Sequence, residues 1–221
     1  MQIALIHTSP TMIPVFKALT DELIKGHSVF NMVDESLLCD IIRDGRCPPG
    51  TARRLVGYVL AAESAGASAI MVTCSSMGRA VETARPLCAA RVLRVDEPMA
   101  ERAVAGGRRV GVVATLPSTL EPTAELIQRK AAEAGRVIEL TSQVVEGAFA
   151  AVIGGDGATH DRLVAAALRE MGRQVDVIVL AQASMARVVE SLSAEDKPVP
   201  ILSSPRLAVE RLAEIAAGYS S

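Results

Sequence analysis

Two segments of the sequence are copies of one design, and this repeat constrains the fold more than any other feature. Residues 54–81 align with residues 162–189 at a shift of 108 (182 − 74), with nine identities in 28 positions. A chain this rich in Ala and Val would give roughly two or three by chance. The identical residues of the first copy are Arg54, Leu55, Val56, Leu60, Ile70, Ser76, Met77, Arg79 and Val81. An earlier pair, Ile3–Pro10 and Val110–Pro117, extends the repeat at a shift of 107, so we expect two related halves.

The two copies differ at one position where chemistry is expected. A hydrophobic run of the first copy ends at Thr73–Ser76, with Cys74 as its second residue. The matching run of the second copy ends at Ala181–Ser184, with Gln182 in that place. We therefore predict one active-site cleft between the halves, with a thiol on one wall and a carboxamide on the other.

Short apolar runs rich in β-branched residues alternate with segments of helical apolar spacing. This alternation predicts an α/β fold with two pseudo-symmetric lobes, each a mainly parallel four-stranded sheet flanked by helices. The predicted strands are Ile3–Ile6, Ser28–Val33, Ser68–Thr73, Val92–Val95, Val110–Ala114, Val137–Leu140, Val175–Leu180 and Val199–Leu202.

The repeat also predicts the limits of the two lobes. It restarts directly after Gly106–Arg109, so the first lobe is expected to span residues 1–105 and the second 106–204. The last helix, residues 205–221, has no counterpart in the repeat, and we expect it to pack back on the first lobe.

Composition excludes several classes of partner. The net charge is −2, with both signs mixed along the chain, so neither nucleic acid nor an anionic membrane is expected to bind. No run approaches the roughly 18 apolar residues of a membrane span, and Met1 leads directly into a strand-like run, so a cytoplasmic protein is expected. The four cysteines match no common zinc or redox spacing, which predicts reduced thiols and no metal site.

Ligands of parallel α/β sheets bind beyond the carboxyl ends of the strands, where loops lead into helix N-termini. Hydroxyl and amide groups gather at four such ends here and suit a small carboxylate. The candidate substrate-binding residues are His7, Thr8, Ser9, Asp34, Ser75, Ser76, Thr115, Thr119, Ala183 and Ser184, beside the catalytic candidates Cys74 and Gln182.

Cys74 is the strongest catalytic candidate. It precedes a predicted helix N-terminus, whose partial positive charge favours the thiolate and lowers the thiol pKa. A base or nucleophile is then available, whereas the alternative is a small buried structural residue. His7 and Asp34 could each supply a further proton-transfer group, but His7 is equally explained as a hydrogen-bonded structural residue and Asp34 as the start of a helix.

The pattern resembles the aspartate/glutamate/hydantoin racemase superfamily, which also includes arylmalonate decarboxylase and maleate isomerase. The resemblance covers nearly the whole chain and rests on the repeated lobes, on Val72–Ser76, and on Gly111–Thr115 with Thr119 following. It implies two catalytic cysteines, one after the third strand of each lobe, of which Cys74 matches the first. It also implies a homodimer, since that is a common arrangement in this superfamily.

Gln182 stands where the resemblance implies the second cysteine. A neutral amide has no proton to exchange near pH 7, so two-thiol racemisation is doubtful. We therefore expect a cofactor-independent racemase or isomerase acting beside the carboxylate of a small acid or amino-acid derivative, with Cys74 as base or nucleophile. The alternatives are a one-cysteine decarboxylase or cis-trans isomerase of the same superfamily, and a non-catalytic protein that binds small carboxylates.

Overall fold

The computed structural model describes residues 1–219, apart from the side chain of Ser184. Contacts between Cα atoms divide the chain into two compact units. Unit 1 comprises Met1–Glu97 and the segment from Pro205 onward, and unit 2 comprises Pro98–Ser204. The sequence repeat places the boundary between the two lobes after residue 105. In the structure, the helix that ends there belongs to unit 2 from Pro98 onward. Among the described residues, no helix is long and apolar enough to cross a membrane.

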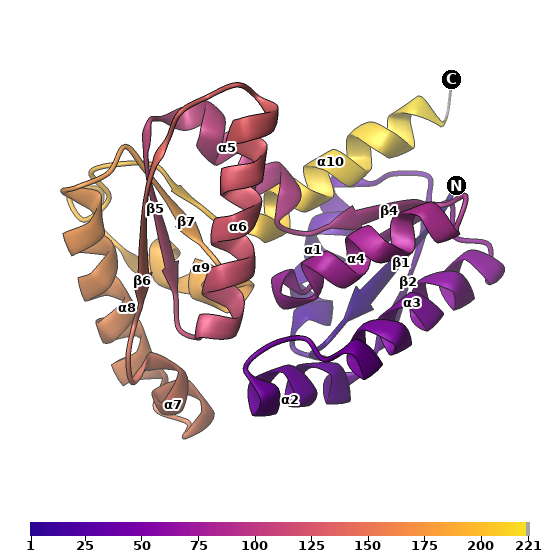
Figure 1. Cartoon of the computed structure of the whole chain (residues 1–221), viewed down its shortest axis with the longest axis horizontal. Coiled ribbons are helices and arrows are strands. Elements are labelled where there is room, and N and C mark those ends of the chain that lie inside the picture. The colour runs from indigo at the N-terminus through magenta and orange to yellow at the C-terminus, as the bar shows by residue number, and fades with distance from the viewer. Residues whose placement is uncertain (220–221) are drawn as a thin grey trace. The chain divides into compact units, whose positions relative to one another are not determined.

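Unit 1 is built on a four-stranded sheet in which every pairing is parallel (Figure 1). Its order is β2-β1-β3-β4, with bounds β1 (Gln2–His7), β2 (Ser28–Val33), β3 (Ala69–Val72) and β4 (Arg91–Arg94). Its helices are α1 (Met12–Leu23), α2 (Glu35–Asp44), α3 (Pro49–Ser64), α4 (Gly78–Ala84) and α10 (Ser204–Gly218), and two short 3₁₀ turns are η1 (Ser75–Met77) and η2 (Arg85–Leu87).

Alternation along β1 gives this sheet two buried faces. Ala4 and Ile6 pack on the face covered by α2, α3 and α4, whereas Ile3 and Leu5 pack on the opposite face. The opposite face is covered by α1 and by Val209 of α10, so the last helix completes the core of unit 1. In Figure 1, the yellow α10 lies beside the strands of this unit.

Unit 2 repeats the same architecture with the order β6-β5-β7-β8, again entirely parallel. Its strands are β5 (Arg109–Ala114), β6 (Glu139–Val144), β7 (Val177–Leu180) and β8 (Ile201–Leu202). Its helices are α5 (Glu97–Gly106), α6 (Pro117–Glu133), α7 (Ala148–Ile153), α8 (Gly157–Gly172) and α9 (Ala186–Ser191), with a 3₁₀ turn η3 (Ala183–Met185). The predicted fold class, two parallel four-stranded sheets flanked by helices, is confirmed.

The predicted bounds of the sixth strand are wrong. The strand runs over Glu139–Val144 rather than over 137–140, and Val137 is 80% exposed outside it. β6 is an edge strand whose residues are mostly polar and exposed, so the apolar pattern that marks a buried strand is absent from it.

Candidate active site

Cys74 lies where a strand turns into a helix. It follows Thr73 at the end of β3 and is the N-cap residue of η1, which leads directly into α4. Because Ile6 of β1 is in register with Val72 of β3, the loop that follows β1 emerges at the same sheet edge. Cys74 is partly exposed as a residue, whereas its sulfur lies in a desolvated position.

The expectation of a lowered Cys74 pKa is wrong. Burial of the sulfur raises the thiol pKa above its usual value, because charge is poorly solvated there. Hydrogen bonds from the Thr8 hydroxyl and from the backbone N–H groups of Ser76 and Met77 oppose this rise. The resting group is therefore a thiol, and these donors stabilise the thiolate that forms when it loses its proton.

Three of the predicted hydroxyl residues of unit 1 lie close to this turn and are buried, namely Thr8, Ser75 and Ser76. The Ser76 hydroxyl has no hydrogen-bond partner within normal geometry among the described residues, and it ranks last among the groups that oppose the rise of the Cys74 pKa. Ser9 is only partly buried, and its hydroxyl bonds to that of Thr11 at 2.8 Å. The hydroxyls of Thr8 and Ser76 therefore belong to the surroundings of the thiol, whereas Ser9 bonds within its own loop.

His7 occupies a structural position. Its ring is fully buried beside Phe16, with Nδ1 2.8 Å from Thr73 Oγ1 and Nε2 2.8 Å from Asn31 Oδ1. A neutral ring satisfies both contacts when Nε2–H donates to Asn31 and Nδ1 accepts the Thr73 proton. Burial lowers the His7 pKa, and the hydrogen bond to Asn31 opposes this change. Because both ring nitrogens are hydrogen-bonded, neither is available to a substrate.

The lowered His7 pKa predicts that acid lowers the stability of unit 1. The unfolded chain takes up a proton near the ordinary histidine pKa of about 6.5, whereas the folded chain resists it. His7 therefore contributes stability above that pH, and the contribution is lost as the pH falls toward the folded pKa. Thermal unfolding at about pH 7.5 and about pH 5.5 should show a smaller pH-dependent loss in His7→Gln than in the unaltered chain. Equal pH-dependent losses in the two proteins would contradict this role.

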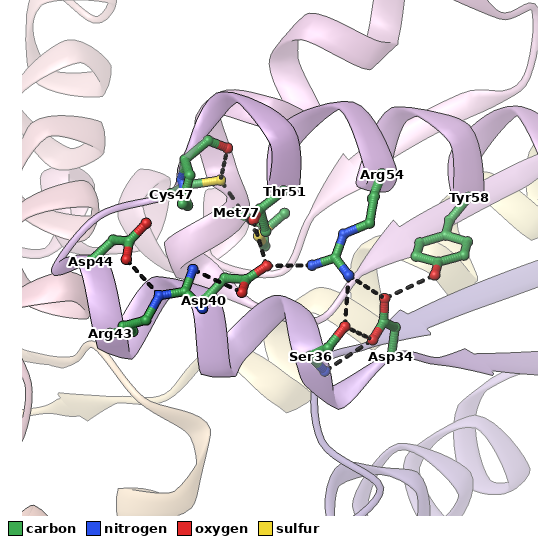
Figure 2. A network of polar contacts seen from close by, with 11 residues as sticks. Asp34, Ser36, Asp40, Arg43, Asp44, Cys47, Thr51, Arg54, Tyr58 and Met77 are labelled. Carbon is green, nitrogen blue, oxygen red and sulfur yellow. Dashed lines mark hydrogen bonds and ion pairs between the residues drawn. The ribbon is translucent and has the colours of Figure 1, made fainter.

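Asp34 caps α2. Its Oδ1 accepts the Ser36 backbone N–H at 2.9 Å, and its Oδ2 accepts the Tyr58 hydroxyl at 2.8 Å (Figure 2). Burial opposes its charge, yet the bonds from Ser36 and Tyr58 and the nearby Arg54 together lower its pKa. Arg54 also binds Asp40, so this network joins α2 to α3. Both carboxylate oxygens are engaged, which agrees with the helix-start interpretation of Asp34.

A cavity of about 270 Å³ lies beside Asp34 in unit 1. Its lining is formed by Ile6, Met32, Val33, Asp34 and Tyr58. The walls are mostly apolar, and the two polar groups are bonded to each other. Since the lining includes a carboxylate and no cation, the cavity suits an apolar or cationic group better than a second carboxylate.

Gln182 is the N-cap residue of η3, the position in unit 2 that matches Cys74 in unit 1. Its Oε1 accepts the backbone N–H of Thr115 at 2.6 Å and the Thr115 hydroxyl at 2.9 Å. The N–H donor fixes the orientation of the amide, because only the oxygen can accept it. The NH₂ group has no acceptor among the described residues, so two donors are left for a ligand.

The other predicted residues of unit 2 lie near the same strand ends. Thr115 is buried after β5, and Thr119 is buried in the first turn of α6, where its hydroxyl donates to the Leu116 carbonyl at 2.8 Å. Ala183 is partly buried in η3, and the side chain of Ser184 lies outside the described part of the structure. Thr115 therefore orients Gln182, whereas the Thr119 hydroxyl bonds within its own helix.

Two features of unit 1 were not predicted from the sequence. Cys47 lies near Cys74, since burial and then the Cys74 thiol raise the Cys47 pKa, and its sulfur is 3.8 Å from that of Met77. Arg94 and Asp96 form an ion pair that is almost fully buried. Their i, i+2 spacing at the end of a buried strand was the available signal for it. In the described part of the chain, no three His, Cys, Asp or Glu side chains gather to hold a metal ion.

Comparison with known families gives one match over almost the whole chain. The sequence model described as Asp/Glu/Hydantoin racemase matches residues 3–212. A search of curated proteins gives no significant match.

Solved structures with the same fold include three racemases. An aspartate racemase from Picrophilus torridus superposes with a TM-score of 0.74 at 15% identity, over 98% of this chain and 94% of that one. A glutamate racemase isoform from Bacillus anthracis gives 0.71 at 19% identity, over 98% and 82%. An allantoin racemase from Klebsiella pneumoniae gives 0.67 at 18% identity, over 99% and 88%. At these identities the superpositions establish a shared fold.

Proposed function

Because the chain belongs to the Asp/Glu/hydantoin racemase family, we propose that it moves a proton at the carbon next to the carboxylate of a small acid or amino-acid derivative. Membership of this family makes the chain an enzyme of the racemase or isomerase type. We assign the proton transfer to Cys74 and the binding of the carboxylate, or of the oxyanion that develops from it, to Gln182.

The observation that carries the proposal is the setting of the Cys74 sulfur. Cys74 is a partly exposed residue at the end of β3, and the Thr8 hydroxyl and the N–H groups of Ser76 and Met77 favour its thiolate. A thiol with a raised pKa is a stronger base once ionised, and the donors reduce the cost of ionising it. These two properties suit removal of a weakly acidic proton from carbon.

Gln182 supports a role in binding rather than in proton transfer. Thr115 holds its oxygen, so its NH₂ group can donate to an anionic oxygen without reorganisation. Since no ionisable group stands at this position, the second proton of a racemisation would need another source. This observation favours a second candidate, a one-cysteine decarboxylase or cis-trans isomerase of the same superfamily.

Deuterium exchange separates the candidates. The chain is incubated in heavy water with a panel of small carboxylic acids and amino-acid derivatives, and NMR follows loss of the proton next to the carboxylate. We expect exchange on at least one member of the panel. Inversion of configuration identifies a racemase, a change of double-bond geometry a cis-trans isomerase, and CO₂ release a decarboxylase. Binding of a panel member without exchange, inversion, isomerisation or CO₂ release would contradict the proposal.

Replacing Gln182 by glutamate tests the binding role. The new side chain can still accept both bonds from Thr115, but it loses the amide donors and adds a negative charge. A hydrogen bond to a charged group contributes about 1.5–3 kcal/mol, so KM should rise roughly 10- to 100-fold. Gln128→Glu, on the exposed surface of α6, makes the same change of charge and should leave KM unaltered. Equal KM values for the two variants would remove Gln182 from the site.

A further inference from the structure

A buried charge cluster stands beside the turn that carries Cys74. Arg94 is 2% exposed and Asp96 1% exposed, and the guanidinium binds this carboxylate through Nε at 2.9 Å and through Nη2 at 2.7 Å. Glu82 of α4 binds Arg94 from the other side. Arg94 is in register with Val72, two residues before Cys74, so the cluster lies at the same end of the sheet as the thiol.

The guanidinium occupies the space above Gly78. A Cβ atom added to this glycine would overlap the central carbon and both terminal nitrogens of Arg94. The backbone of Gly78 is ordinary right-handed helix, with φ −52° and ψ −45°, so no unusual torsion calls for glycine here. Glycine is therefore required by the close approach of Arg94.

This contact is coupled to the thiol through the backbone. Gly78 is the first residue of α4 and directly follows Met77. The Met77 N–H donates to the Cys74 carbonyl at 3.2 Å and closes the turn, so a shift of Gly78 displaces the turn that holds Cys74. Two carboxylates offset the charge of Arg94, which leaves steric support as its main effect on the turn.

The second copy of the repeat lacks both the thiol and this support. Gly78 corresponds at the shift of 108 to Ala186 in unit 2. The pairing of Val179 with Leu202 places Ser203 where Arg94 stands in unit 1. The close Gly–Arg contact therefore occurs in the copy that keeps its cysteine, and not in the copy that has Gln182.

We propose that Arg94, held by Asp96 and Glu82, is a positioning residue that packs on Gly78 and holds the η1 turn, and with it Cys74, in place. Its effect on turnover rests on the proposed function, whereas its effect on the thiol is independent of any substrate. Cys47 is the other titratable group that acts electrostatically together with Cys74, so the test removes it.

The test measures the thiol directly. In a background with Cys39, Cys47 and Cys88 replaced by alanine, the rate of alkylation by iodoacetamide is followed against pH, and its midpoint gives the pKa of Cys74. Gly78→Ala should raise this midpoint by about one unit, which slows alkylation about tenfold below the midpoint. Gly57→Ala is the matched control, because Gly57 lies in α3 of the same unit with open space around it. Equal midpoints in the two folded variants would overturn the proposal.

Arg94→Lys provides an independent arm if Gly78→Ala does not fold. Lysine keeps the charge but lacks the planar fork, so the midpoint should rise in this variant too. The narrower side chain leaves room for a Cβ, and Gly78→Ala combined with Arg94→Lys should shift the midpoint by less than the sum of the single shifts. Additive shifts, or an unchanged midpoint in Arg94→Lys, would count against the proposal. If the midpoint shifts as expected in a chain that shows no exchange activity, the role of Arg94 is supported and only the proposed function is contradicted.

Discussion

Cys74→Ala is expected to lower kcat for exchange of the proton next to the carboxylate by about 10²- to 10⁴-fold, the usual contribution of a positioned acid or base. Alanine removes the thiol to which we assign this proton transfer, and leaves the Thr8 hydroxyl and the two backbone donors in place. The measurement is deuterium incorporation in heavy water at saturating substrate, with circular dichroism as the check on folding.

Cys39→Ala is the control for this substitution, since Cys39 is an exposed free cysteine of the same unit. It should retain full activity. A Cys74→Ala variant that exchanges the proton within about twofold of the unaltered chain would exclude the thiol as the base, whatever the substrate.

Asp96→Asn is expected to cost about 3 kcal/mol of unfolding free energy, because it leaves the Arg94 charge buried with only the more exposed Glu82 to balance it. The amide has the shape of the carboxylate, so packing is preserved and the change isolates the charge. Urea unfolding should show a lower midpoint with an unchanged slope.

The Arg206–Glu22 pair provides the control, because it also has two hydrogen bonds, through Nη1 and Nη2, and joins α10 to α1. Its side chains are 50% and 53% exposed, so water replaces the lost contact, and Glu22→Gln should leave the urea midpoint nearly unchanged. Similar losses in the two variants would mean that burial does not set the energy of the Arg94 cluster.

Much of the fold could be predicted because buried parallel strands leave a strong signal in the sequence. Apart from β6, each strand of the two sheets overlaps a predicted apolar run, and the repeat correctly indicates two sheets of one topology. β6 is the exception, since an exposed edge strand needs few apolar residues and its true start at Glu139 is polar.

The site could be predicted only in part. Topology locates the strand ends, and with them Cys74, Thr8, Thr115 and Gln182. Sequence does not reveal the partners of a side chain, and partners decide whether Asp34 and His7 are free to act. The sign of the Cys74 pKa shift depends on a balance between burial and N–H donors, which only coordinates provide.

The place of α10 has a consequence for biosynthesis. Unit 2 is one continuous stretch inserted between the two parts of unit 1, so the ribosome releases it whole while unit 1 still lacks its final helix. Until Val209 and Leu212 emerge, the face of the first sheet around Ile3 and Leu5 has no cover on that side. The nascent chain therefore carries an apolar surface for the whole time that its middle is being translated, a period in which chaperone binding would protect it.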